Sequence, residues 1–114
     1  MAKAKMKSPI SLILTIVDDG VGERVEEYLL AHKLSNGILF NGKGTAESMV
    51  ADIFGFGLGN RDVIIVLVPV EKQDKVLEDI TKLTGIEEDE YGLSMIIPID
   101  AASSTILDQM GIRL

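Results

Sequence analysis

The sequence predicts an α+β fold in which one antiparallel sheet carries two helices on the same face. Two observations lead to this prediction. Four apolar segments have the composition of strands, and two segments between them repeat apolar residues at helical spacing, in the order β-α-β-β-α-β. That order folds most simply as a ferredoxin-like sandwich. With 114 residues, we expect a flexible basic tail over 1–9 and a single domain over 10–114.

The first strand and helix are predicted over Ile10–Val17 and Gly22–Lys33. Between them lies Asp18-Asp19-Gly20, where either aspartate is a candidate cap for the helix. The apolar stripe of this helix consists of Val21, Val25, Tyr28, Leu29 and His32. His32 falls in the last turn, so we interpret it as a boundary residue of the stripe and not as a catalytic group.

The second strand, Gly37–Asn41, is followed by Asn41-Gly42-Lys43-Gly44-Thr45-Ala46. We interpret this stretch as a glycine turn. Exposed backbone N–H groups in such a turn form a concave surface that suits an anion. It lacks the spacing of a phosphate-binding P-loop. An ordinary bulge or tight bend is the alternative interpretation.

The second half of the chain repeats the pattern. A third strand is predicted over Asp62–Val70 and a second helix over Glu71–Leu83, with Val76, Leu77, Ile80 and Leu83 facing inward. Glu71–Lys75 and Glu78–Lys82 are expected to pair along this helix, and Thr84-Gly85 ends it. A fourth strand covers Leu93–Ile99, where Pro98 suits an edge or a strand end. Ala101–Leu114 is expected to add one amphipathic turn.

Composition and charge exclude several classes of function. The chain has no cysteine, which excludes disulfides and thiolate metal sites, and its net charge of −7 argues against nucleic acid as a partner. The lysines of Met1–Lys7 are not followed by an apolar segment of the kind found in signal peptides, and no apolar run has the length of a membrane helix. We therefore expect a cytoplasmic protein. No Ser-His-Asp arrangement or metal-ligand spacing is present, and the loop after the first strand is too acidic for an acylphosphatase. We therefore expect no catalytic residue, no metal site and no enzyme activity.

The apolar residues exceed what two helices can cover. Two helices bury one face of a sheet, yet the first and third strands carry apolar residues on both faces: Ile13, Val17 and Ile65, or the alternates Ile64 and Val66. An uncovered apolar face is unusual on a soluble monomer. We therefore expect other copies of the chain to bury the second face.

Residues 10–100 resemble the PII-type (nitrogen regulatory PII-like) signal-transduction proteins, in their compact divergent branch. The resemblance rests on the segment from Ser35 to Ala46, the start of the third strand at Arg61-Asp62-Val63, and Thr84-Gly85. It implies a homotrimer that binds an adenine nucleotide (ATP, ADP or AMP) in clefts between subunits. It also implies that a flexible loop, residues 46–60, docks on a transporter, an enzyme or a regulator.

The resemblance also implies roles for particular residues. Gly42, Lys43, Gly44, Thr45 and Ala46 would lie near the phosphates, and Ser35, Asn36 and Gly37 would line the neighbouring subunit's wall of the cleft. The apolar residues of the partner loop are Met49, Val50, Ile53, Phe54 and Phe56.

The chain departs from this family pattern in two places. Four carboxylates occupy 87–90, where the family offers glycines and a lysine, and the paired late arginines are missing, with Arg113 the sole late arginine. Both changes favour a smaller or less charged ligand, such as ADP, AMP or bicarbonate. A CutA-type trimeric metal-responsive protein and a ligand-free adaptor are the competing interpretations.

Overall fold

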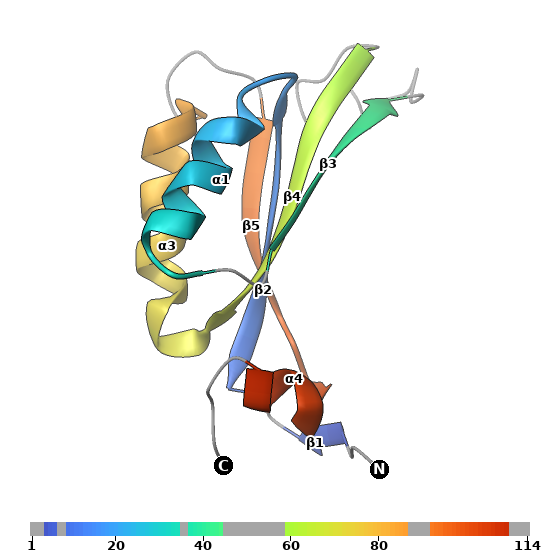
Figure 1. Cartoon of the computed structure of the whole chain (residues 1–114), viewed down its shortest axis with the longest axis vertical. Helices are drawn as coiled ribbons and strands as arrows, with labels where there is room; N and C mark the ends of the chain where they lie inside the picture. Colours follow the sequence, from blue (N-terminus) through green and yellow to red (C-terminus); the bar gives the residue numbers. More distant parts are fainter. Residues whose placement is uncertain (1–3, 7–8, 35–36, 45–58, 87–91, 110–114) are drawn as a thin grey trace.

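The computed structural model describes residues 4–6, 9–34, 37–44, 59–86 and 92–109 (Figure 1). Its elements are β1 (Ala4–Met6), β2 (Ile10–Asp18), α1 (Gly22–Ala31), β3 (Gly37–Gly44), β4 (Gly59–Pro69), α3 (Val70–Thr84), β5 (Gly92–Pro98), β6 (Ala101–Ser103) and α4 (Ser104–Gln109). Four strands form an antiparallel sheet in the order β3-β4-β2-β5, and β1 pairs with β6 in a separate ribbon. The predicted ferredoxin-like sandwich is confirmed.

The core lies between the sheet and the two long helices. β2 pairs with β4 from Ile10↔Pro69 to Asp18↔Arg61, and with β5 along its other side. Because side chains alternate along a strand, every second residue of β2 and β4 points toward the helices. The buried apolar cluster contains Ile13, Val17, Val25, Leu29, Leu34, Ile64, Val66, Val68, Val76 and Ile80. α1 and α3 both cover this one face (Figure 1).

The helices end where their sequences stop favouring a helix. In α1, Val25 and Leu29 are buried, and His32 lies just past the last helical residue with an exposed side chain. His32 is therefore a boundary residue, as expected. In α3, Val76 and Ile80 are buried, and the helix ends at Gly85, whose φ of 73° is in the left-handed region that glycine tolerates.

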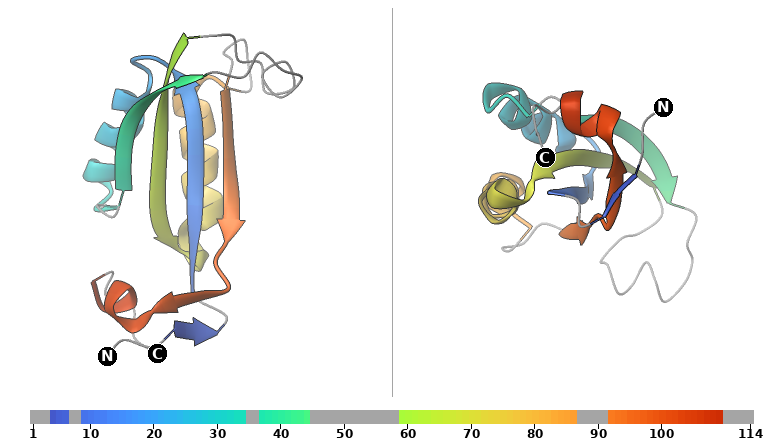
Figure 2. Two further views of the ribbon diagram at one scale, coloured as in Figure 1. Left: turned by 90° about the vertical axis from the view of Figure 1, so that its right-hand side faces the viewer. Right: turned by 90° about the horizontal axis from the view of Figure 1, so that it is seen from below.

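The opposite face of the sheet carries no helix, as the left view of Figure 2 shows. We call it the open sheet face. Its residues follow from the strand registers and are Leu12, Leu14, Ile16, Ile38, Phe40, Val63, Ile65, Leu67, Leu93, Met95 and Ile97. Ile65, one of the apolar residues expected on the second face, lies there. The expectation for Ile13 and Val17 is wrong, because both are buried under the helices together with the alternates Ile64 and Val66. The reason is the register, since a shift by one residue exchanges the two faces.

Three segments differ from expectation. Ala4–Met6, placed in the flexible tail, form β1 and pair with β6 from Ala4↔Ser103 to Met6↔Ala101. The C-terminal stretch forms a short strand followed by α4, where one amphipathic turn was expected. β3 continues three residues beyond Asn41, because β4 begins at Gly59 and offers partners as far as Gly44. Among the described helices, none is long and apolar enough to cross a membrane.

Candidate functional site

The described part of the glycine-rich segment, residues 41–44, is the end of an edge strand and not a turn. Gly42, Lys43 and Gly44 pair with Arg61, Asn60 and Gly59 of β4. Gly42 and Gly44 do not have positive φ angles; among the described glycines, those that do are Gly20, Gly85 and Gly92. The expected concave surface of N–H groups is therefore replaced, at these three residues, by an extended backbone whose outer edge pairs with no described strand.

A charged row crosses the sheet beside Gly42. Gly42 is opposite Arg61 in β4, and Arg61 is opposite Asp18 in β2, so the three positions share the open side of the sheet. Arg61 Nε lies 3.7 Å from Asp18 Oδ1, and the Arg61 side chain is 18% exposed. A Cβ atom added to Gly42 would meet no described atom within 4 Å. The row therefore places the half-buried Arg61 side chain beside a glycine, at the end of an apolar face.

On the helix side of the same sheet end, a buried carboxylate closes the turn between β2 and α1. Asp62 Oδ2 accepts hydrogen bonds from the N–H groups of Gly20 and Gly22, at 2.8 and 2.9 Å. Its Oδ1 accepts one from Asn41 Nδ2 at 2.8 Å, and Asn41 Nδ2 also donates to Asp19 Oδ1 at 2.6 Å. Asp62 itself is only 6% exposed. The N–H donors of this turn are thus occupied by the chain's own carboxylate.

This arrangement corrects the expected cap of the first helix. The N-cap residue of α1 is Val21, which supplies no side-chain hydrogen bond. Among the contacts described, neither Asp18 nor Asp19 accepts a hydrogen bond from a backbone N–H at the start of α1. Asp62, on the neighbouring strand β4, accepts these hydrogen bonds. A carboxylate near the first turn also favours the helix dipole. Asn41 joins this cap to β3, so the end of β3 and the start of α1 are mechanically connected.

The other expected site residues are separated or lie outside the described residues. Gly37 begins β3, five residues from Gly42, or roughly 17 Å along an extended strand. Within one chain the two ends of β3 therefore cannot touch one small ligand. Ser35, Asn36, Thr45, Ala46, the acidic stretch 87–90 and all the expected partner-loop residues, Met49, Val50, Ile53, Phe54 and Phe56, fall outside the described residues.

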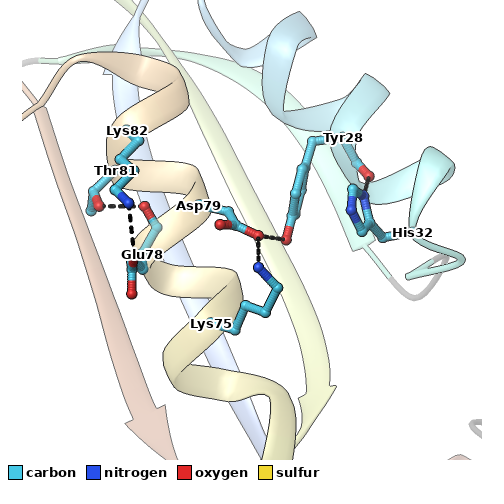
Figure 3. Close-up of polar contacts among 7 residues, drawn as sticks. All are labelled: Tyr28, His32, Lys75, Glu78, Asp79, Thr81 and Lys82. Carbon is cyan, nitrogen blue, oxygen red and sulfur yellow. Dashed lines mark hydrogen bonds and ion pairs between the residues drawn. The ribbon is translucent and has the colours of Figure 1, made fainter.

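A second polar cluster joins the two helices (Figure 3). The Tyr28 hydroxyl of α1 donates to Asp79 Oδ2 of α3 at 2.6 Å, and Lys75 Nζ lies 3.3 Å from the same oxygen. Burial, together with the neighbouring Asp79 carboxylate, raises the pKa of Tyr28 well above its usual value. The Tyr28 hydrogen bond, with help from Lys75, lowers the pKa of Asp79 despite some desolvation.

The ion pairs along α3 follow the prediction only in part. Lys82 pairs with Glu78 at 2.8 Å, as expected. Lys75 pairs with Asp79 in place of Glu71, because the carboxylate of Asp79 is already held in position by Tyr28. The expected Glu71–Lys75 pair is therefore wrong, and the side chains of Glu71 and Lys72 have no ion pair or hydrogen bond with any described residue.

Two site residues at the end of the sheet, Arg61 and Asp62, were missed in the sequence analysis. They were interpreted only as the start of a strand. The available signal was an adjacent pair of opposite charges leading into an aliphatic strand, which alternation sends to opposite faces. No local pattern, however, shows that Asp62 caps a helix forty residues earlier.

Comparison with known proteins gives structural neighbours and no sequence match. No protein-family model and no curated protein matches the chain. A DUF3240 family protein from Shewanella baltica is 17% identical with a TM-score of 0.60, covering 81% of this chain and 91% of that one. Arabidopsis thaliana PII bound to citrate is 16% identical with a TM-score of 0.61, covering 82% and 79%.

The periplasmic divalent cation tolerance protein CutA from Archaeoglobus fulgidus is 18% identical with a TM-score of 0.65, covering 90% of this chain and 95% of that one. At these identities the comparisons establish the architecture. The chain has the ferredoxin-like fold shared by PII and CutA proteins.

Proposed function

We propose that this chain is a PII-like regulatory protein without catalytic activity, which assembles as a homotrimer through the open sheet face. The ligand would be an adenine nucleotide (ATP, ADP or AMP) or another small anion, bound in the clefts between subunits. The response would reach a partner protein, such as a transporter, an enzyme or a regulator, through the loop 46–60.

The open sheet face is the observation that supports assembly. Along one row, Ile38, Ile65, Leu14 and Met95 lie side by side across all four strands. Ile38 is 64% exposed and Met95 37% exposed at the two edges. Contiguous apolar surfaces of this kind mark interfaces in soluble proteins. The cleft that the family resemblance implies, with Gly42 of one copy and Gly37 of another, requires such assembly, because the two residues are too far apart within one chain.

The row of Gly42, Arg61 and Asp18 supports an anion at the subunit boundary. It lies at the end of the open sheet face, so a neighbouring copy would border it. A guanidinium binds phosphate or carboxylate through paired hydrogen bonds. Asp18 Oδ1 lies 3.7 Å from Arg61 Nε, so an anion that binds here would compete with Asp18 for this side chain. The anion would then accept hydrogen bonds from the Arg61 guanidinium and from backbone N–H groups at the outer edge of β3.

Light scattering tests the assembly. The trimer predicts a mass of about 37 kDa, three times the 12.3 kDa of the chain. Leu14→Arg places a charge in the middle of the open sheet face and is expected to give folded monomers. Leu30→Arg is the matched control, because Leu30 is 63% exposed on α1, on the opposite side of the sheet. A wild-type monomer at micromolar concentration contradicts the proposal.

Calorimetric titration tests the ligand. ATP, ADP and AMP with and without Mg²⁺, then citrate and bicarbonate, are added to the wild type and to Arg61→Gln. We expect Arg61→Gln to weaken anion binding at least tenfold, because a charge-assisted contact is lost. Arg24→Gln, which removes an equal charge from the exposed side of α1, should bind as the wild type does. Equal losses in both variants, or no heat with any anion, would rule out this ligand site.

A CutA-like metal-responsive protein is the second candidate, favoured by the coverage of 90% and 95% in the comparison with the Archaeoglobus protein. Among the described residues no group of three or more His, Cys, Asp or Glu side chains could hold a metal ion. A metal site would therefore need residues from more than one copy or from the undescribed segments. Heat on titration with Cu²⁺, without any heat from nucleotides, would favour this candidate.

A further inference from the structure

A cleft of about 240 Å³ opens between the two helices, where α1 ends and α3 begins. It is lined by Tyr28, His32, Leu34, Glu71, Lys72, Lys75 and Val76. A second hollow, beside α1 and β3, holds only about 60 Å³. Because the helices cover the face opposite the open sheet face (Figure 1), assembly through the sheet leaves this cleft accessible. It is separate from the anion site proposed above.

The inner wall of the cleft is apolar and already in position. Leu34 is 7% exposed and Val76 3% exposed, so they form its floor. The rings of Tyr28 and His32 lie against each other, with centroids 4.2 Å apart and planes inclined by 30°. The Tyr28 hydroxyl is fixed on Asp79, so this side chain offers the cleft its ring and not its polar end (Figure 3). Such a surface suits an apolar or aromatic group.

The rim carries two opposite charges that nothing in the described chain neutralises. Lys75 is paired with Asp79, at 3.3 Å, on the side of the cleft formed by α3. Glu71 and Lys72, by contrast, are exposed at the cleft and unpaired among the described residues. A purely anionic ligand would meet the Glu71 carboxylate, and a purely cationic one would meet Lys72 and Lys75.

We propose that the cleft binds an apolar α-amino acid as its zwitterion. The ligand carboxylate pairs with Lys72, its ammonium group pairs with Glu71, and its side chain packs on Leu34, Val76 and the Tyr28 ring. The volume agrees with this class, since a cavity of about 150 Å³ accommodates benzene. The remaining space holds the α-carbon and its two charged groups.

The single histidine provides the measurement. His32 is the only histidine in the chain, so its imidazole proton resonances report the cleft without assignment of the whole spectrum. L-phenylalanine is titrated at constant ionic strength, followed by 3-phenylpropionate, which lacks the ammonium group, and 2-phenylethylamine, which lacks the carboxylate. We expect a saturable shift with phenylalanine, with a Kd on the order of 1 mM for so small a ligand. Each truncated probe should bind about threefold to fivefold more weakly.

Substitutions at the two exposed rim residues, Lys72 and Glu71, separate the roles of their charges. Lys72→Gln should weaken phenylalanine and 3-phenylpropionate about threefold to fivefold and leave 2-phenylethylamine unchanged. Glu71→Gln should give the converse pattern. Lys82→Gln is the control, because it removes an equal charge from the last turn of the same helix.

Far-UV circular dichroism of each variant checks the fold. The proposal is overturned if the shift does not saturate, if all three probes shift His32 equally, or if the control loses as much affinity as Lys72→Gln. None of these readouts depends on nucleotide binding, so this proposal and the proposed function can fail separately.

Discussion

Replacing Asp62 by alanine is expected to be among the most destabilising single changes in the described part of the chain. Its carboxylate accepts three hydrogen bonds, from Gly20 N–H, Gly22 N–H and the Asn41 amide, at 2.8, 2.9 and 2.8 Å. A hydrogen bond to a charged group contributes about 1.5–3 kcal/mol, and the losses are not additive. We expect Asp62→Ala to lower the free energy of unfolding by about 3–4 kcal/mol, a large share of the 5–15 kcal/mol typical of a domain.

The measurement is urea unfolding followed by circular dichroism, with all variants at the same protomer concentration because assembly contributes to stability. Asp62→Asn keeps one acceptor oxygen and should lose about half as much. Asp74→Ala is the control, since Asp74 is exposed on α3, and it should change the free energy by less than about 0.5 kcal/mol. If Asp62→Ala and Asp74→Ala differ by less than about 1 kcal/mol at equal m-values, the reasoning on the cap is refuted.

The turn and the inter-helix cluster give further predictions. Gly22→Ala should cost about 2 kcal/mol or more in urea unfolding, because the added Cβ would lie 2.8 Å from a buried side chain of β4. Gly20→Ala, with open space but a φ of 91°, should cost only about 1 kcal/mol of strain, and the reverse ranking would contradict this. In a Tyr91→Phe variant, tyrosinate absorbance should report Tyr28 ionising well above pH 10; ionisation near pH 10 would contradict the buried hydrogen bond. Because the pKa of Asp79 is lowered in the folded state, the stability it contributes is present above about pH 4 and is lost as the pH falls through the folded-state pKa. In acid unfolding experiments, the stability of Asp79→Asn should therefore fall less than that of the wild type as the pH decreases below about 4.

The sequence by itself determined the kind of each long element and the class of fold. Alternating and helical periodicities depend only on neighbouring residues, so β2, α1, β4 and α3 were predicted to within a few residues. Gly85 and Pro98 ended their elements as expected, because backbone restrictions at glycine and proline are local. The surplus of apolar residues likewise required a second, uncovered face before any register was known.

Only the tertiary structure decided which residues meet. The register of β2 against β4 sent Ile13 to the helices and Leu14 to the open sheet face, a choice that a one-residue shift would reverse. The cap of α1 by Asp62 and the pairing of Lys75 with Asp79 each depend on a partner or a support from another element. The cleft between α1 and α3 exists because the end of one helix lies beside the start of the other. Such contacts join distant parts of the chain, and local periodicity carries no information about them.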